Sequence, residues 1–198
     1  MMMPLRLAAL CCFAVFLLQG CIPSLHPLYT AKDLVTHKAL AQQSYVGGNC
    51  EWEFKTIEGE KAYQLIHTEN SKVAHFKVHL VKLDEYLFFD FYPISKVSEA
   101  DPISPPQIPK GNTFSEMHVV PVHSFAKAEF VEGNIVIQQF DADWLEKLFK
   151  ERRIRIKHER TEKGIVLTAS TKELQKFILK YAEEDKAYTE AIVLAPKL

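Results

Sequence analysis

The chain has 198 residues, the length of about one domain, and its 24 Lys and Arg residues nearly balance its 25 Asp and Glu residues. This balance argues against a basic nucleic-acid-binding protein, and only 7 glycines and 10 prolines argue against a fibrous or broadly disordered chain. With 47% hydrophobic residues, the chain has enough apolar material for a globular core.

The first twenty residues are typical of an export signal. Arg6 and the amino terminus are positively charged, and the uncharged segment 7–18 that follows falls short of the roughly 20 residues needed to span a bilayer. The next four residues resemble the bacterial lipobox, in which a cysteine is acylated and becomes the first residue of the mature chain: Leu18, Gln19, Gly20 and Cys21. We therefore expect residues 1–20 to be a cleaved signal peptide and Cys21 to carry lipid.

Lipidation of Cys21 would determine whether the protein is attached to the membrane reversibly or permanently. One myristoyl chain binds reversibly, at about 0.8 kcal/mol per buried methylene, whereas the lipobox resemblance implies two or three acyl chains and a permanent anchor. Ile22 follows in place of an aspartate, which resembles lipoproteins sorted to the outer membrane. We expect a protein of the cell envelope, on the outer membrane and facing the periplasm, with residues 21–44 as a tether that contains Pro23 and Pro27.

Residues 45–198 are expected to form a single domain built from short strands. The clearest strand lies at 73–82, where apolar Phe76, Val78 and Leu80 alternate with polar residues, which is the period of a half-buried strand. The other runs of this kind are 50–57, 61–68, 86–92, 118–131, 135–140, 154–160 and 165–169. Because short turns join most of these runs, we expect an antiparallel meander, with residues 191–195 as a last closing strand.

Residues 93–113 interrupt the meander. The segment carries five prolines, which cannot donate to a strand ladder. We expect a surface loop over one end of the sheet. A loop of this length can have a function, or it can simply connect two strands.

Two helices stand out against the β pattern. Asp143 is expected to cap a helix over 144–152, with Glu146 at the third helical position of a capping box. The second helix is expected over 171–183, where Ser170 and Glu173 form a capping box. An apolar stripe at helical spacing should pack this helix on the sheet: Leu174, Phe177, Ile178 and Tyr181.

The order of these elements resembles that of the lipocalin-like barrels, which place a helix and a last strand after about eight antiparallel strands. Closure into a barrel would remove the exposed strand edges. The Gly-x-Trp signature of lipocalins is not met, because Gly47 is followed by Gly48 and Asn49 and the tryptophan arrives at Trp52. The fold class is therefore mainly β, as a lipocalin-like barrel or a half-open sheet packed on the C-terminal helix.

A further resemblance covers most of the mature chain. The mature N-terminus reads Cys21-Ile-Pro-Ser-Leu-His-Pro-Leu-Tyr-Thr30, followed by Asp33-Leu34. Further segments that carry the resemblance are His123-Ser-Phe125, Asp143-Trp-Leu145 and Leu167-Thr-Ala-Ser-Thr171 with Leu174-Gln175. The chain resembles a group of small, uncharacterised bacterial lipoproteins that begin Cys-x-Pro-Ser-Leu-His-Pro-Leu-Tyr. The resemblance implies an exported, membrane-tethered domain and supplies no activity.

No motif in the sequence names a reaction. There is no Gly-x-Ser-x-Gly, His-Glu-x-x-His, Cys-x-x-Cys or phosphate-binding glycine loop. His75 and His79 share one face of a strand, but four residues along a strand span about 13 Å, too far for one metal ion. A metal site would need His67, His118 or His123 from neighbouring strands, and we expect none.

Carboxylates are the remaining candidates for chemistry. Asp141 and Asp143 are interpreted as turn and cap residues, whereas Asp90, between Phe89 and Phe91, would act as an acid or base only if held in a cleft. We therefore expect a protein that is not an enzyme and has no catalytic residue, cofactor, metal or nucleic-acid partner.

One charge cluster is a candidate partner surface. Cations of this kind contribute about 1 kcal/mol each close to an anionic lipid surface, although a plain solvated face would look the same. Seven of them fall within fourteen residues: Lys147, Lys150, Arg152, Arg153, Arg155, Lys157 and Arg160.

Two functions fit these expectations. The first is a carrier that holds a small apolar or amphipathic ligand inside the barrel, and the second is an envelope protein that docks on another membrane protein through the basic cluster or the proline-rich loop. A hydrolase of an envelope component is a third, which lacks a nucleophile and base. The barrel interior separates the first two, because side-chain packing would exclude the carrier, whereas an apolar cavity of roughly 300 Å³ or more would favour it.

Overall fold

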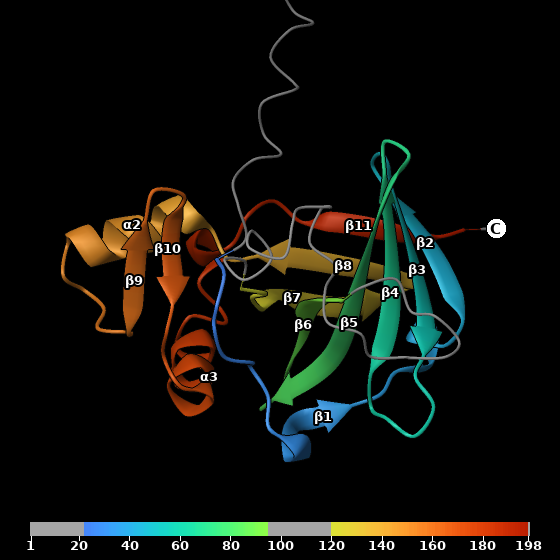
Figure 1. Ribbon diagram of the computed structural model, residues 1–198, viewed down its shortest axis with the longest axis horizontal. Coiled ribbons are helices and arrows are strands. Elements are labelled where there is room, and N and C mark those ends of the chain that lie inside the picture. Colours follow the sequence, from blue (N-terminus) through green and yellow to red (C-terminus); the bar gives the residue numbers. More distant parts are fainter. Residues whose placement is uncertain (1–21, 95–119, 198) are drawn as a thin grey trace, which may run out of the picture.

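The fold is mainly β, and eight antiparallel strands close into a barrel (Figure 1). The computed structural model describes residues 22–94 and 120–197. The barrel strands are β2 (Gln43–Gly47), β3 (Cys50–Thr56), β4 (Tyr63–Glu69), β5 (Lys72–Leu83), β6 (Tyr86–Ile94), β7 (Ser124–Val131), β8 (Asn134–Gln139) and β11 (Ile192–Pro196). Strands β2 to β8 form a meander, and β11 closes it between β8 and β2. This closure confirms the lipocalin-like barrel and excludes the half-open sheet.

The closing strand β11 divides its pairing between its two neighbours. Its first three residues pair with β8, and Ala195 and Pro196 pair with Val46 and Tyr45 of β2. A Cβ atom at Gly47 would lie only 2.5 Å from Cδ2 of Leu194, so β2 passes β11 at a distance that a side chain would obstruct. The seam of the barrel is therefore short and close-packed.

Two of the predicted barrel strands lie outside the barrel. β9 (His158–Thr161) and β10 (Gly164–Leu167) pair with each other in a separate two-stranded sheet, and the strand expected from residue 154 begins only at His158. The barrel uses β2, which was not predicted, and β11, which matches the predicted run 191–195. The alternation of side chains indicates a strand but not its pairing partner, which explains the error.

The two helices lie where the sequence predicts them, with one change of cap. In α2 (Ala142–Lys150) the cap is Asp141, whose side chain accepts a hydrogen bond from the Trp144 N–H at 2.8 Å, so the prediction of Asp143 is wrong. The capping box of Ser170 and Glu173 opens α3 (Thr171–Lys180) as expected. The remaining elements are the short β1 (Leu34–Val35), which pairs with β5, and 3₁₀ turns at 31–33, 38–40 and 185–187.

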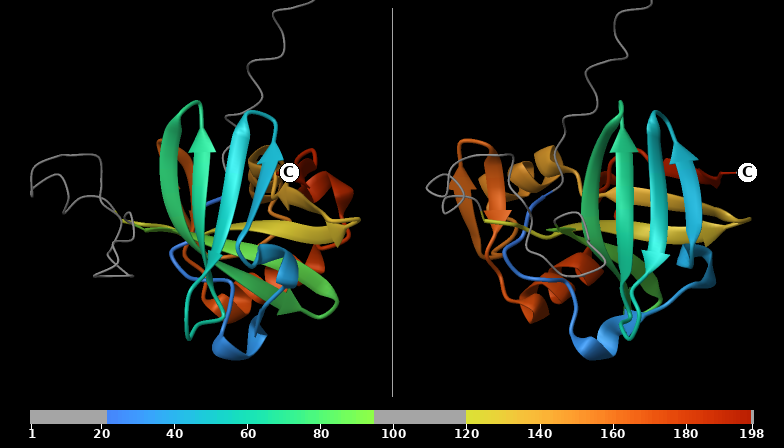
Figure 2. Two further views of the ribbon diagram at one scale, coloured as in Figure 1. Left: turned by 90° about the vertical axis from the view of Figure 1, so that its right-hand side faces the viewer. Right: turned by 45° about the vertical axis from the view of Figure 1, so that its right-hand side comes forward.

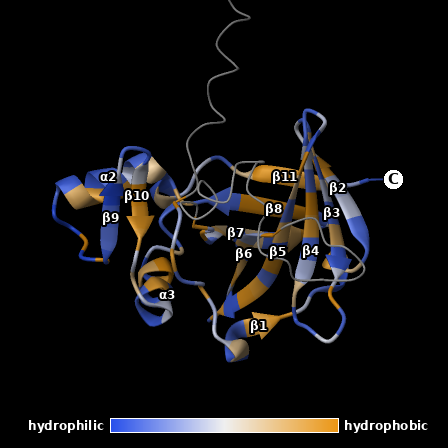
Figure 3. Cartoon of the chain, viewed as in Figure 1, coloured by the Kyte–Doolittle hydropathy of each residue, from blue (hydrophilic) through white to orange (hydrophobic). Residues whose placement is uncertain are grey.

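Two apolar cores lie on opposite sides of the barrel wall. Hydrophobic residues recur along the barrel strands and along the helices beside them (Figure 3). The inner core fills the barrel, and the outer core lies between the barrel and the layer of α2, α3, β9 and β10, which gathers on one side of it (Figure 2). Neighbouring residues serve opposite cores: Phe88 packs in the outer core and Phe89 in the inner one. The middle of β6, from Phe88 to Phe91, is buried on both faces, so this part of its sequence approaches a continuous apolar run apart from Asp90.

The segment expected to be a tether is part of the folded domain. Ile22 is 8% exposed, and Ser24, Leu28 and Leu40 are fully buried. Prolines at 23 and 27 favour extended backbone, which suggested a tether, but extended backbone is also what a strand-like segment in a sheet requires. Residues 22–44 therefore pack on the barrel.

Candidate functional site

The N-terminal residues form a bridge between the barrel and the small sheet. Ser24 exchanges both backbone hydrogen bonds with His123, at 2.9 Å and 2.8 Å, just before β7 begins. On the other side, the Leu25 N–H donates to the Leu167 carbonyl at 2.9 Å, and the Leu167 N–H donates to the Pro23 carbonyl at 2.8 Å. The segment thus acts as a strand that joins β10 to the barrel, and Pro23 fits there because only its carbonyl is needed.

A buried carboxylate fixes the next residues of this segment. Asp90 on β6 has no exposed surface, and its Oδ2 accepts a hydrogen bond from the Leu28 N–H at 2.7 Å. Its Oδ1 lies 2.7 Å from Nδ1 of His123, which donates because an ionised carboxylate can only accept. Asp90 is therefore a structural clamp under the N-terminal segment and not an acid or base in an open cleft.

Two aromatic rings complete the clamp. The Tyr29 ring lies 4.2 Å from the ring of His79, between centroids, and covers it. His79 is only 6% exposed, and burial lowers its pKa to about 4, so it is neutral at pH 7. Burial, with the charge of Asp90, raises the pKa of Tyr29 to about 12. The alternating pattern of 73–82 puts His79 on the polar face of its strand, and the N-terminal segment covers this part of the barrel wall.

Helix α3 holds the same segment from the other side. The Thr171 hydroxyl donates to the Pro27 carbonyl at 2.8 Å. Gln175 Nε2 donates to the Leu28 carbonyl at 2.8 Å and to Oδ2 of Asp33 at 2.9 Å. These residues lie in two short segments, 27–33 and 171–175. The structure therefore brings together segments that lie far apart in the sequence, which no local pattern could show.

These features define a class of protein, a lipocalin-like β-barrel whose N-terminal segment is locked to its wall. No protein-family model, curated protein or solved structure matches the chain.

The barrel interior is occupied by side chains. None of its core residues is more than 7% exposed: Leu40, Tyr45, Phe54, Tyr63, Leu65, Val78, Leu80, Phe89, Phe91, Ala126, Ala128, Ile135, Ile137 and Leu194. Rings of Trp52, Phe54, Phe89 and Phe91 pack with centroid distances of 5.5 to 6.5 Å. The described part of the barrel is thus a packed core.

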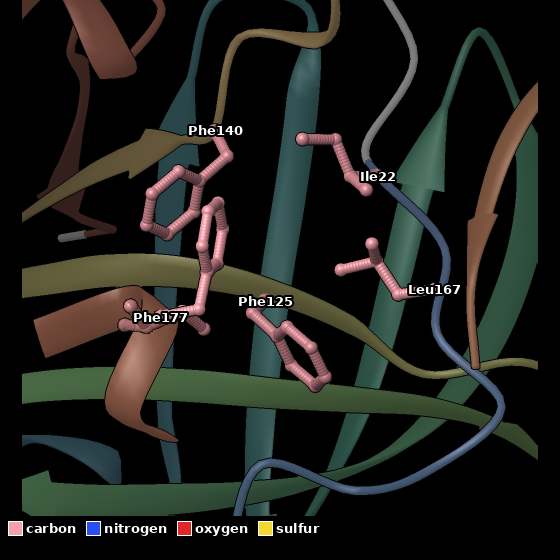
Figure 4. Close-up of a pocket in the computed structure, with 6 residues that line it drawn as sticks. Ile22, Phe125, Phe140, Leu167 and Phe177 are labelled. Atoms are coloured by element: carbon pink, nitrogen blue, oxygen red, sulfur yellow. The ribbon is translucent and has the colours of Figure 1, made fainter. Parts of the chain in front are cut away.

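Two hollows of the described chain lie outside the barrel. One of about 10 Å³ lies between the barrel wall and α3, where Figure 4 shows Ile22 beside Phe125, Phe140, Leu167 and Phe177. This volume is no more than that of a single water molecule. The other is an open groove of about 380 Å³ at the tips of the β2–β3 and β4–β5 hairpins. Neither is an apolar cavity inside the barrel.

Five of the seven cations of the basic cluster lie near carboxylates, and these five share three glutamates. Arg160 donates to both carboxylate oxygens of Glu146, at 2.7 Å and 2.9 Å, and Lys157 lies 3.8 Å from Glu173. Lys147, Lys150 and Arg153 also lie within 4.0 Å of a glutamate. Arg152 and Arg155 have no carboxylate at this distance among the described residues. A partner surface at this cluster stays a prediction.

The other predicted sites give less information. No group of three or more metal-ligating side chains occurs within the described ranges 22–94 and 120–197, and His118 lies outside them. Leu18, Gln19, Gly20 and Cys21 of the lipobox also lie outside the described residues. In the part of the chain that the structure describes, no helix is long and apolar enough to cross a bilayer.

Proposed function

We propose that the protein is a lipid-anchored envelope protein, without enzymatic activity, whose barrel serves as a solid scaffold for interaction with other envelope components. The observation that carries this proposal is the packed interior of the barrel. A carrier needs room for its ligand, and binding pockets for small molecules usually measure about 300 to 1,000 Å³. The described interior holds aromatic and aliphatic side chains instead.

The anchor rests on the lipobox at residues 18–21 and on the apolar segment before it. The locked N-terminal segment is consistent with this anchor. Ile22, directly after Cys21, packs against Phe125 and Leu167, so a lipid on Cys21 would hold the whole domain and not a loose tail. The outer membrane, facing the periplasm, is the location we propose.

Expression of the full chain in a bacterium that processes lipoproteins tests the anchor. We expect the mature protein to begin at Cys21, to carry acyl chains by mass spectrometry and to fractionate with the outer membrane. Cys21→Ala should abolish acylation and leave residues 1–20 attached. A wild-type chain that is recovered without acyl groups would refute the anchor.

Native mass spectrometry of residues 22–198, beside a denatured control, tests the scaffold. We expect one mass, that of the protein alone, because the barrel is filled. A small molecule that copurifies and is released on unfolding would refute the solid scaffold and favour the carrier.

A further inference from the structure

The bridge formed by the N-terminal residues has an outer face that is partly exposed to solvent in the described structure. Ile22 and Ser24 point into the fold, at 8% and 0% exposure. Since side chains alternate along an extended segment, Pro23 and Leu25 point to the opposite side, and Leu25 is 45% exposed.

The two neighbours of the bridge extend this face with apolar side chains. On β10, Ile165 and Leu167 pack in the outer core, so Val166 between them points outward. Before β7, His123 turns in toward Asp90, which places Val122 on the outer side. Val120 is 67% exposed, more than any other large hydrophobic residue of the described chain. We call Pro23, Leu25, Val120, Val122 and Val166 the N-terminal face.

Two of the three segments that form this face carry no full charge, whereas Val166 on the third pairs with the exposed Glu159 of β9. Charged residues make up 25% of the chain, yet the segments 22–31 and 120–126 contain no Asp, Glu, Lys or Arg. Transfer of a charged side chain from water into an apolar phase is unfavourable, whereas transfer of an apolar side chain is favourable. The composition therefore fits a surface that meets lipid better than one that faces water.

The position of the proposed lipid anchor indicates that the lipid bilayer covers the N-terminal face. Cys21 is bonded directly to Ile22, which is already packed in the fold, so no free residue separates an acylated cysteine from the domain. At about 3.3 Å per residue, Leu25 lies within roughly 13 Å of Cys21 along the chain. We propose that the N-terminal face lies on the lipid bilayer and fixes the orientation of the barrel relative to it. This inference rests on the proposed lipid anchor.

Fluorescent labelling of the lipidated full chain tests the orientation. After cleavage at Cys21, Cys50 is the one unmodified cysteine, so Cys50→Ser gives a background for single labels. Leu25→Cys and Val120→Cys would carry an environment-sensitive nitrobenzoxadiazole label. Val131→Cys and Val193→Cys are matched controls, because these residues are 46% and 53% exposed on β7 and β11. All four positions are exposed, so the substitutions should leave the fold intact, and two positions on the face guard against failure of one.

The labelled proteins are placed in phosphatidylcholine vesicles with or without spin-labelled lipid. We expect the spin label to quench the fluorescence at Leu25 and Val120 and to leave Val131 and Val193 unchanged. Equal quenching at all four positions, or none at Leu25 and Val120, overturns the proposal. So does a blue-shifted label at Leu25 without vesicles, which would mean that a second copy of the chain covers the face.

Mass spectrometry before reconstitution separates this inference from the one on which it rests. A chain without acyl groups at Cys21 refutes the lipid anchor and with it the orientation. An acylated chain whose label at Leu25 stays exposed to water refutes only the orientation, and leaves the anchor in place.

Discussion

Replacing Asp90 by alanine tests whether the buried carboxylate locks the N-terminal segment to the barrel. Asp90 accepts hydrogen bonds from the Leu28 N–H and from His123 Nδ1, both at 2.7 Å, and has no exposed surface. A hydrogen bond to a charged group contributes about 1.5 to 3 kcal/mol, and breaking a buried pair costs about 3 to 5 kcal/mol. We expect Asp90→Ala to lower the free energy of unfolding by about 4 kcal/mol.

Thermal and urea unfolding of residues 22–198 measure this loss. At about 2 to 4 °C per kcal/mol for a chain of this size, the Tm should fall by about 8 to 16 °C. Because Asp90 and His123 share one contact, the loss in Asp90→Ala/His123→Ala should be smaller than the sum of the single losses by about 1 kcal/mol or more. Glu129→Ala is the control, since this exposed carboxylate on β7 should change stability by no more than about 0.5 kcal/mol.

The reasoning about this clamp would be refuted by either of two results. One is a loss below about 1 kcal/mol in Asp90→Ala, which would mean that water satisfies the Leu28 N–H equally well. The other is full additivity with His123→Ala, which would mean that the two side chains do not interact in solution.

Three further predictions follow from the seam, the buried histidine and the helix cap. Gly47→Val should lower the urea midpoint by an amount equivalent to about 2 kcal/mol, because its Cβ would meet Leu194, whereas an unchanged midpoint would mean that β11 can move away. His79 has a pKa of about 4 in the folded protein against 6.5 in its ordinary state, so its contribution to stability is fully present above pH 6.5 and is lost as the pH falls to 4. Urea unfolding between pH 6.5 and 4 should show that His79 accounts for a loss of about 3 kcal/mol in the free energy of unfolding. This loss should be absent in His79→Phe. An equal dependence of the free energy of unfolding on pH in both proteins would contradict the burial of His79. Asp141→Ala should cost about 1 kcal/mol in thermal unfolding and Asp143→Ala distinctly less, and the reverse order would restore Asp143 as the cap of α2.

The sequence predicts the meander well because each of its strands carries its own evidence. β3 to β5 alternate in hydropathy, and β6 and β8 contain short apolar runs. Turn residues separate all five, which is enough to fix antiparallel neighbours. β2 was missed because only five residues pair there and one of them is glycine. β9 and β10 look like barrel strands by the same local evidence, although they pair apart from the barrel.

The clamp could not be predicted because its partners are distant in sequence. Asp90 and Leu28 are separated by 62 positions, and Gln175 and Leu28 by 147. An aspartate in an apolar strand suggests either a functional carboxylate or a buried hydrogen-bond acceptor, and only the position of the N-terminal segment decides between them. The same holds for His79, whose neighbour Tyr29 makes an apparently exposed residue a buried one.

The position of β11 at the barrel seam determines when the barrel can close during synthesis and folding of the chain. A chain is synthesised from its N-terminus, so β2 to β8 exist before Ile192–Pro196 leaves the ribosome. Until then, β2 and β8 are open sheet edges that can pair with another chain. Barrel closure thus depends on Ile192–Pro196, and a chain that ends before residue 192 would keep two open sheet edges that promote aggregation.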